Sequence, residues 1–327
     1  MADRTEQQRP DNGPPATDGR APESPTKLGA RPWAGVLKRS ARGFSANNLT
    51  DRAAALTYYG VQAIFPALLA LISILGLIGK SATQPLVKNL SKVAPGPAQK
   101  IFTHAIQNLQ HSRGAAGALV IVGIVLALWS ASGYVGGFMR ASNAIYGVPE
   151  GRPFWVKRPV QLAVTLVLIV LLALSAVAVV LTGGLATQVG KVLGVGSSAV
   201  TVWDIAKWPV LLVVVSLMFG ILYWAAPNVR HAGFRWLTPG GIVAVLLWIV
   251  ASLAFAFYVA NFSHYNKTYG SLGGIIAFLV WLWISNVTVL FGAQLNAELE
   301  RGRQLAAGAP AEGELPVTPR MTKAKDK

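Results

Sequence analysis

The sequence lacks cysteine altogether and has very few carboxylates in its hydrophobic part. Without cysteine the chain has neither disulfide bonds nor thiolate metal sites. Between residues 53 and 297 the only acidic residues are Glu150 and Asp204. Charged residues make up 13% of the chain, against about 25% in ordinary soluble domains. Hydrophobic residues make up 53% and the mean hydropathy is +0.47, so the composition predicts an integral membrane protein.

The scarcity of carboxylates also bears on enzyme activity. Hydrolysis of a phosphodiester usually needs clustered carboxylates for metal ions, or paired histidines for general acid and base catalysis. The chain has no Walker motif, and no G-x-G-x-x-G motif in a strand context. Its four histidines are scattered: His104, His111, His231 and His264. We therefore expect no enzyme activity, with no catalytic residue, no metal site and no cofactor.

The net charge of +16 raises the question of a nucleic-acid partner. The basic residues, however, are spread through the tails and through short loops between hydrophobic runs. Membrane topology explains such a distribution better than a nucleic-acid surface does. We expect membrane lipids as partners and no nucleic acid.

Six hydrophobic runs are each long enough to cross a bilayer, since about 20 helical residues span a core of about 30 Å. They lie near residues 53–79, 115–139, 160–185, 206–226, 239–262 and 271–297. The predicted fold is an all-α integral membrane protein with a domain of six transmembrane helices over 53–301. Twelve Lys and Arg residues flank the spans on the side of the termini and eight on the other, which places both termini in the cytoplasm.

The flanking segments have their own patterns. Residues 1–31 are polar and rich in proline, and residues 302–327 are rich in Ala, Gly and Pro, so both are predicted to be disordered tails. Residues 32–52 mix Trp33, Val36 and other apolar residues with basic ones. That mixture predicts an interfacial amphipathic helix on the membrane surface.

The segment 80–114, between the first two runs, carries five basic residues and no acid. After Pro97 its apolar residues fall on one helical stripe, which predicts an amphipathic helical hairpin lying on the outer membrane surface. A solvated positive loop is the alternative. If the hairpin forms, Lys88, Lys92 and Lys100 are candidate contacts for anionic lipid headgroups.

Polar side chains within the spans are candidates for a cavity or substrate path, because polar groups inside a membrane are costly. Pro66 in the first run should also kink its helix. The candidates are Tyr58, Tyr59, Gln62, Pro66, Asn261, Tyr265, Asn266, Tyr269, Asn286 and Gln294. The alternative is that each one stabilises contacts between helices, by about 0.6 kcal/mol on average.

The end of the second run is a further candidate site. Gly133 and Gly137 have the spacing that lets another helix come close. Arg140 and Asn143 follow on one helical face as the chain leaves the membrane. Together with Arg152 they form a candidate cytoplasmic face.

Four segments resemble the YihY/BrkB family of bacterial inner-membrane proteins, once named ribonuclease BN. They are AAALTYYGVQAIFPALLAL from residue 53, RASNAIYGVPEGRPFW from Arg140, PGGIVAVLLWIVASLAFAFYVANFSHYNKTYGSLGG from Pro239, and WLWISNVTVLFGAQLNAELER from Trp281. The resemblance implies a six-span inner-membrane protein that moves a lipid or an envelope component, as a transporter or flippase-like facilitator. A membrane scaffold without transport activity is the alternative, and a ribonuclease is disfavoured by the residue content.

Asn286 is the residue on which the cavity hypothesis depends most. Its neighbours four positions away, Leu282 and Leu290, offer no side-chain hydrogen bond, so its partners must come from elsewhere. On the family resemblance, we expect Tyr58, Tyr59 and Gln62 to form the opposite wall. Asn286→Leu and Tyr59→Phe are then expected to abolish activity while the protein still folds.

Overall fold

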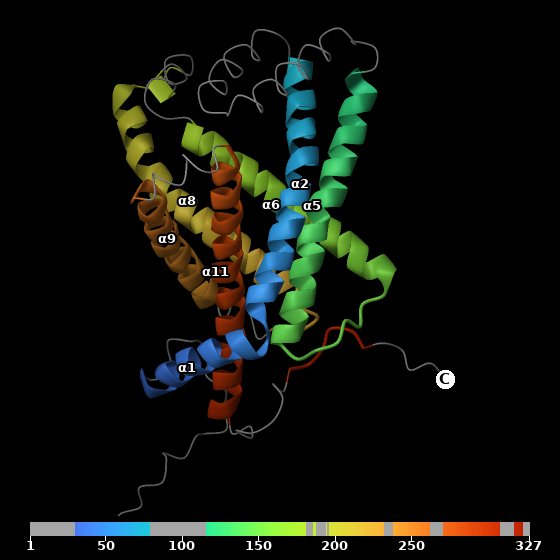
Figure 1. Cartoon of the computed structure of the whole chain (residues 1–327), viewed down its shortest axis with the longest axis vertical. Helices are drawn as coiled ribbons and strands as arrows, with labels where there is room; N and C mark the ends of the chain where they lie inside the picture. The colour runs from blue at the N-terminus through green and yellow to red at the C-terminus, as the bar shows by residue number, and fades with distance from the viewer. Residues whose placement is uncertain are drawn as a thin grey trace, which may run out of the picture.

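The computed structural model describes residues 30–78, 116–180, 186–187, 194, 196–231, 238–261, 271–307 and 317–322. Over these ranges the chain is all-helical apart from one isolated β-bridge (Figure 1). The helices are α1 (Ala30–Ala46), α2 (Leu49–Ile78), α5 (Ala116–Ile145), α6 (Phe154–Val180), α8 (Ser197–Ala225), α9 (Thr238–Asn261) and α11 (Ser271–Ala306). The prediction of an all-α protein is confirmed.

Within the described ranges, five helices are long and apolar enough to cross a membrane. The spanning stretches are Ile121–Ile145, Phe154–Ser175, Ser198–Ala225, Pro239–Asn261 and Gly273–Ala306, in α5, α6, α8, α9 and α11. Their large aliphatic and aromatic side chains are widely exposed, as expected of surfaces that face lipid. The chain is therefore a multi-pass membrane protein.

Helices α2 and α5 lie side by side along most of their length (Figure 1). Gly133 and Gly137 of α5 make this approach possible, because the ring of Tyr59 from α2 lies against both. A Cβ atom on Gly137 would come within 3.0 Å of the Tyr59 ring and 3.1 Å of Leu56. An alanine at Gly137 would require the Tyr59 ring or the Leu56 side chain to shift by a few tenths of an ångström.

Helix α1 lies across the last part of α11 (Figure 1). Its apolar side is buried there, with Val36 packed against Leu295 and Leu299. Arg39 adds an ion pair to Glu298 at 2.9 Å. The apolar face of this amphipathic helix is thus buried against another helix of the same chain.

A break separates α1 from α2, where the sequence predicts one amphipathic segment over 32–52. Asn48 has φ of +50°, a left-handed conformation that asparagine tolerates better than most residues. Arg52 stabilises the turn, since its Nε donates to the carbonyl of Asn47 at 2.9 Å. Helix α2 consequently begins at Leu49.

One end of the helix bundle, which we call the polar end, gathers the starts of α2, α6 and α9 and the ends of α5, α8 and α11. It lies in the lower part of Figure 1. Buried hydrogen bonds join these ends, for example between Gly240 and Asn296 and between Arg152 and Ala225. Most of the buried core, including Leu56, Phe138 and Tyr223, lies here as well. We call the remaining part of the spanning helices the apolar half.

The C-terminal part of the chain differs from the predicted disordered tail over 302–327. Helix α11 continues to Ala306, and residues 317–322 lie against the polar end. Of the predicted tail over residues 1–31, residues 1–29 lie outside the described residues, and residues 30 and 31 belong to α1. The predicted hairpin over 80–114, with Lys88, Lys92 and Lys100, also lies outside the described residues.

Candidate functional site

The loop between α5 and α6 forms the centre of the polar end. Arg152 Nε donates to Glu150 Oε1 at 2.8 Å, and its Nη2 donates to Glu150 Oε2 at 2.9 Å. The same guanidinium donates to the carbonyls of Ala225 and Ala226, at 3.3 and 2.7 Å. Burial tends to raise the pKa of Glu150, but the hydrogen bonds and charge of Arg152 outweigh it and bring that pKa below its ordinary value. One buried arginine thus ties the start of α6 to the end of α8.

Two buried asparagines extend this network. Asn143 donates to Glu150 at 3.2 Å, and its Oδ1 accepts from the backbone N–H of Asn228 at 2.8 Å. The structure therefore brings the predicted residues Asn143 and Arg152 together through Glu150. Arg140, the third member of the predicted cytoplasmic face, is exposed and donates to the Tyr59 hydroxyl instead.

Residues 317–322, which we call the C-terminal strap, pair with the chain after α8. The backbone N–H of Arg230 donates to Thr318 at 2.9 Å, and that of Arg320 donates to Asn228 at 3.0 Å. The Asn228 side chain donates to the carbonyl of Met321 at 2.7 Å and accepts from its N–H at 3.1 Å. Gly151 makes the fit possible, because any side chain there would overlap the Met321 carbonyl.

Asn286 is buried in α11 and is hydrogen-bonded to two other helices. Its Oδ1 accepts from the Tyr134 hydroxyl at 2.7 Å, and its Nδ2 donates to the Thr57 hydroxyl at 3.0 Å. The expected partners Tyr58, Tyr59 and Gln62 are therefore replaced by Thr57 and Tyr134. Consecutive helical residues point about 100° apart, so Thr57 faces α11 while Tyr58 is 63% exposed.

The other predicted path residues are dispersed. The Tyr59 hydroxyl accepts from Arg140 Nη2 at 2.9 Å, and Gln294 accepts from Asn47 at 3.0 Å near the start of α2. Gln62 and Asn261 are exposed, and Asn261 donates to Phe257 of its own helix. The structure places Pro66 within α2 without describing its side chain, and Tyr265, Asn266 and Tyr269 lie outside the described residues.

A pocket of about 260 Å³, which we call the inner pocket, opens between α2, α5, α6 and α8. Its wall is almost entirely apolar, with Leu168, Leu172 and Phe219 among the larger side chains. Its polar contributions are Thr165 and Tyr134, and the Tyr134 hydroxyl bonds Asn286. The inner pocket thus adjoins the polar contact between α2, α5 and α11.

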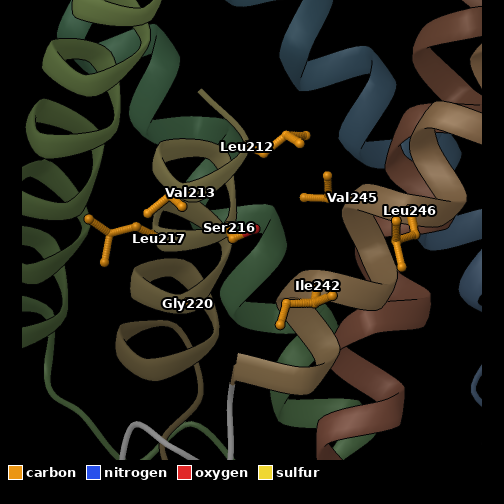
Figure 2. A pocket seen from close by; sticks show the side chains of 8 residues that line it. All are labelled: Leu212, Val213, Ser216, Leu217, Gly220, Ile242, Val245 and Leu246. Carbon is orange, nitrogen blue, oxygen red and sulfur yellow. The ribbon is translucent and has the colours of Figure 1, made fainter. Parts of the chain in front are cut away.

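A second recess of about 420 Å³, which we call the α8–α9 groove, runs between those two helices. Figure 2 shows its lining, with the Ser216 hydroxyl as the one polar side chain among the labelled residues. The lining residues are Leu212, Val213, Ser216, Leu217, Gly220, Ile242, Val245 and Leu246. Both helices are spanning helices, so the α8–α9 groove lies at the depth of the lipid chains.

Several residues of these networks carried no signal in the sequence. Thr57, Tyr134 and Asn228 are ordinary polar residues whose importance depends on which helices meet. Glu150 had a signal, because it is one of two acids between residues 53 and 297. No group of three His, Asp or Glu side chains suited to a metal ion occurs in the ranges that the structure describes.

The spanning helices, the buried polar pairs between them and the apolar recesses define a multi-pass α-helical membrane protein. Within that class, the chain belongs to the Virulence factor BrkB family, whose model matches residues 40–314. The resemblance seen in the sequence is thereby confirmed. No solved structure matches the chain.

Named relatives support the assignment. A Bacillus subtilis protein named ribonuclease-like protein YfkH is 28% identical over 269 residues, covering 82% of this chain and 96% of that protein. A UPF0761 membrane protein of Aromatoleum aromaticum is 30% identical over 281 residues, covering 81% of this chain and 64% of that protein. A UPF0761 membrane protein of Xanthomonas campestris is 26% identical over 271 residues, and the chain spans 60% of its length.

Proposed function

We propose that the chain is an inner-membrane facilitator that moves a lipid or another amphiphilic envelope component across the bilayer. The observation that carries this proposal is the inner pocket. An apolar recess lined by four helices, and open on one side where Leu172 is exposed, can accommodate a lipid chain. The hydroxyl protons of Tyr134 and Thr165 are donated to Asn286 and to the Gln161 carbonyl, and their oxygens can still accept a hydrogen bond from the polar part of an amphiphile.

The wall of the inner pocket also favours passive movement over proton-coupled transport. Its polar side chains are a tyrosine and a threonine, neither of which changes charge near neutral pH. Proton relays in transporters are usually built from carboxylates and histidines. The proposed activity is therefore movement down a gradient.

The proposal includes six spans, with α2 as the sixth, because its 30 residues exceed the length needed to cross a bilayer. Both termini and the polar end then face the cytoplasm, and the segment 80–114 faces outward as an amphipathic hairpin. A single cysteine at position 92 can test this orientation, since the chain has none of its own. We expect a membrane-impermeant reagent to label it from outside, and labelling only from the cytoplasmic side would contradict the topology.

The ribonuclease-like name of the Bacillus subtilis relative suggests a different activity. Three acids at the polar end are paired with arginines: Glu150 with Arg152, Glu298 with Arg39 and Glu300 with Arg303. Carboxylates held in this way are poor ligands for a catalytic metal ion. We therefore propose that the chain is not a nuclease.

Reconstitution into proteoliposomes tests the proposed function. A fluorescent phospholipid placed in both leaflets is quenched from outside with a reductant that does not cross the bilayer. We expect the protein to raise the quenched fraction from about half toward completeness, because lipid from the inner leaflet becomes accessible. The quenched fraction can also stay at the value for empty vesicles, both with phospholipids and with lipid-linked sugars. In that case the transport proposal is wrong and a membrane scaffold is favoured.

A further inference from the structure

The α8–α9 groove leads toward an exposed tryptophan at the polar end. Leu217, Gly220 and Trp224 are spaced three and four residues apart on α8, so Trp224 continues the stripe that lines the groove. Its side chain is 49% exposed. This spacing puts the indole about one turn beyond Gly220 on the same face of α8, a position that we call the mouth of the groove. Tryptophan near the end of a spanning helix usually meets lipid headgroups.

The C-terminal strap places a cation on this tryptophan. The Arg320 guanidinium carbon lies 4.9 Å from the centre of the Trp224 ring. Arg320 Nε donates to the carbonyl of Val229 at 2.8 Å, and its Nη2 donates to the carbonyl of Trp224. A guanidinium has five N–H donors, so others remain for a ligand.

The charge around Arg320 is positive. The exposed Arg230 is two residues from Asn228, to which the backbone of Arg320 is bonded. Among the described residues neither arginine has a carboxylate within ion-pair distance. Glu150, an acid of the same end, is already held by Arg152 and Lys157. The mouth of the groove therefore offers positive charge to an anion.

We propose that the α8–α9 groove, Trp224 and the strap residue Arg320 bind one anionic phospholipid. The phosphate lies against Arg320 and Trp224, and one acyl chain lies between α8 and α9. This occupant fits both parts of the site, since the groove is apolar at membrane depth and its mouth is cationic. Arginine also suits a phosphate better than lysine does, because its planar donors bind two oxygens.

This lipid site includes a residue outside the part of the chain that the family model matches, and lipid binding there does not depend on transport activity. The family model ends at residue 314, whereas Arg320 lies in the strap beyond it. The lipid would bridge the strap and the two spanning helices. Bound in this way, it also stabilises the strap against the polar end by mass action.

Native mass spectrometry of the full chain in detergent tests the proposal, with phosphatidylglycerol and phosphatidylcholine of identical acyl chains as probes. Wild type should bind phosphatidylglycerol about tenfold more tightly, which corresponds to about 1.4 kcal/mol. Arg320→Gln should remove most of that preference, and Arg320→Lys should retain part of it. The matched control is Arg42→Gln, which removes one exposed charge from α1 and should change the affinity less than twofold.

The groove has its own matched pair on α9. Leu246 lines the groove and is 57% exposed, whereas Leu253 is 67% exposed and does not line it. Leu246→Trp should weaken the binding of both lipids severalfold, and Leu253→Trp should leave their binding unchanged. Unfolding temperatures near the wild-type value would show that these variants remain folded.

Three results would overturn the site. Equal losses for Arg320→Gln and Arg42→Gln would show that only net charge attracts the lipid. Unchanged lipid affinity for Leu246→Trp would show that no chain occupies the groove. A wild-type dimer that Leu246→Trp converts to a monomer would assign the groove to a second copy. This experiment measures lipid binding and not transport. The lipid site can therefore be disproved while the proposed function stands, and the proposed function can be disproved while the lipid site stands.

Discussion

The polar end and the apolar half of the bundle are held together in different ways. At the polar end, buried Arg152, Asn143 and Asn228 exchange directional hydrogen bonds between helices and the strap. In the apolar half, side chains such as Leu172 and Phe257 are 60% and 72% exposed and would face lipid. Among the described residues of the apolar half, hydrogen bonds between helices are sparser: Trp248 donates to Ser285 at 2.9 Å and Trp281 donates to Ser252 at 3.2 Å. Helices joined by fewer such bonds in a membrane can part more easily. We infer that the polar end is the fixed base and that movement is confined to the apolar half.

The largest effect should come from removing the centre of the polar end. Arg152→Ala leaves Glu150 without its main partner and two carbonyls of α8 without a donor. Truncating one member of a buried ion pair costs about 3–5 kcal/mol. We expect the unfolding temperature in detergent to fall by many degrees. Arg42→Ala, an exposed arginine of α1, is the control and should change it little.

The next effect concerns pH and His231, which packs edge-on against Tyr146 beside the strap. Burial, helped by the charge of Arg320, lowers the pKa of His231 from 6.5 to about 4. The folded state thus favours the neutral form. The contribution of neutral His231 to the stability of the folded protein is complete above pH 6.5. It is lost as the pH falls toward 4, because the histidine takes up a proton in the unfolded chain first.

Between pH 7 and pH 5, protonation of His231 in the unfolded chain should lower the free energy of unfolding by about 2 kcal/mol. The loss is about 1.4 kcal/mol for each pH unit below 6.5. His231→Gln, which does not titrate, provides the comparison. We expect its unfolding temperature to fall less over the same pH interval. Parallel curves for the two proteins would mean that His231 is not linked to the stability of the polar end.

A smaller effect is expected in the middle of the bundle. Asn286→Leu removes two hydrogen bonds, to Thr57 and Tyr134, each worth about 0.6 kcal/mol in a membrane interior. The stability should therefore fall by about 1 kcal/mol, with folding and purification intact. Transport should fall more strongly, because Tyr134 loses the bond that fixes it in the wall of the inner pocket. A gain in stability would show that this polar contact is dispensable.

Tyr59→Phe removes the acceptor for Arg140 while it keeps the ring that packs on Gly133 and Gly137. This hydrogen bond is exposed, so the stability should change by less than about 0.5 kcal/mol. The sequence predicted a loss of activity for this variant as well. The transport assay tests that prediction, and wild-type rates would place Tyr59 among the packing residues.

The smallest effect is expected in the apolar half. Phe257→Ala shortens a side chain that is 72% exposed on α9. Lipid replaces the lost contact, so the stability should change by less than about 0.5 kcal/mol. A loss close to that of Arg152→Ala would contradict the contrast between the two regions, because it would show that this surface is buried against another protein surface.

The sequence predicted the spanning helices well where the apolar run is uninterrupted. The run at 239–262 matches α9, Thr238–Asn261. Helix α8 instead starts at Ser197, nine residues before the predicted run. Asp204 and Lys207 lower the local hydropathy there, but they pair at 2.8 Å on one helical face, and the helix continues through them.

The candidate site was only partly predictable. Asn143, Arg152, Asn286 and Gln294 were identified as polar residues in unusual places, and all four are buried and bonded. Their partners depend on helix rotation and on contacts between distant segments, which residue spacing does not encode. The strap has no local pattern of its own, since its extended form depends on pairing with Asn228.

The central claim is that the inner pocket beside Tyr134 holds the moving amphiphile. Ala63 lines this pocket, whereas Ala54 is exposed on the same helix outside it. The direct measurement is the lipid redistribution rate in proteoliposomes containing Ala63→Leu or Ala54→Leu. We expect Ala63→Leu to slow the rate at least tenfold at an unchanged unfolding temperature, while Ala54→Leu matches wild type. Equal rates for both variants would contradict the claim, because a filled pocket would then have no effect on movement.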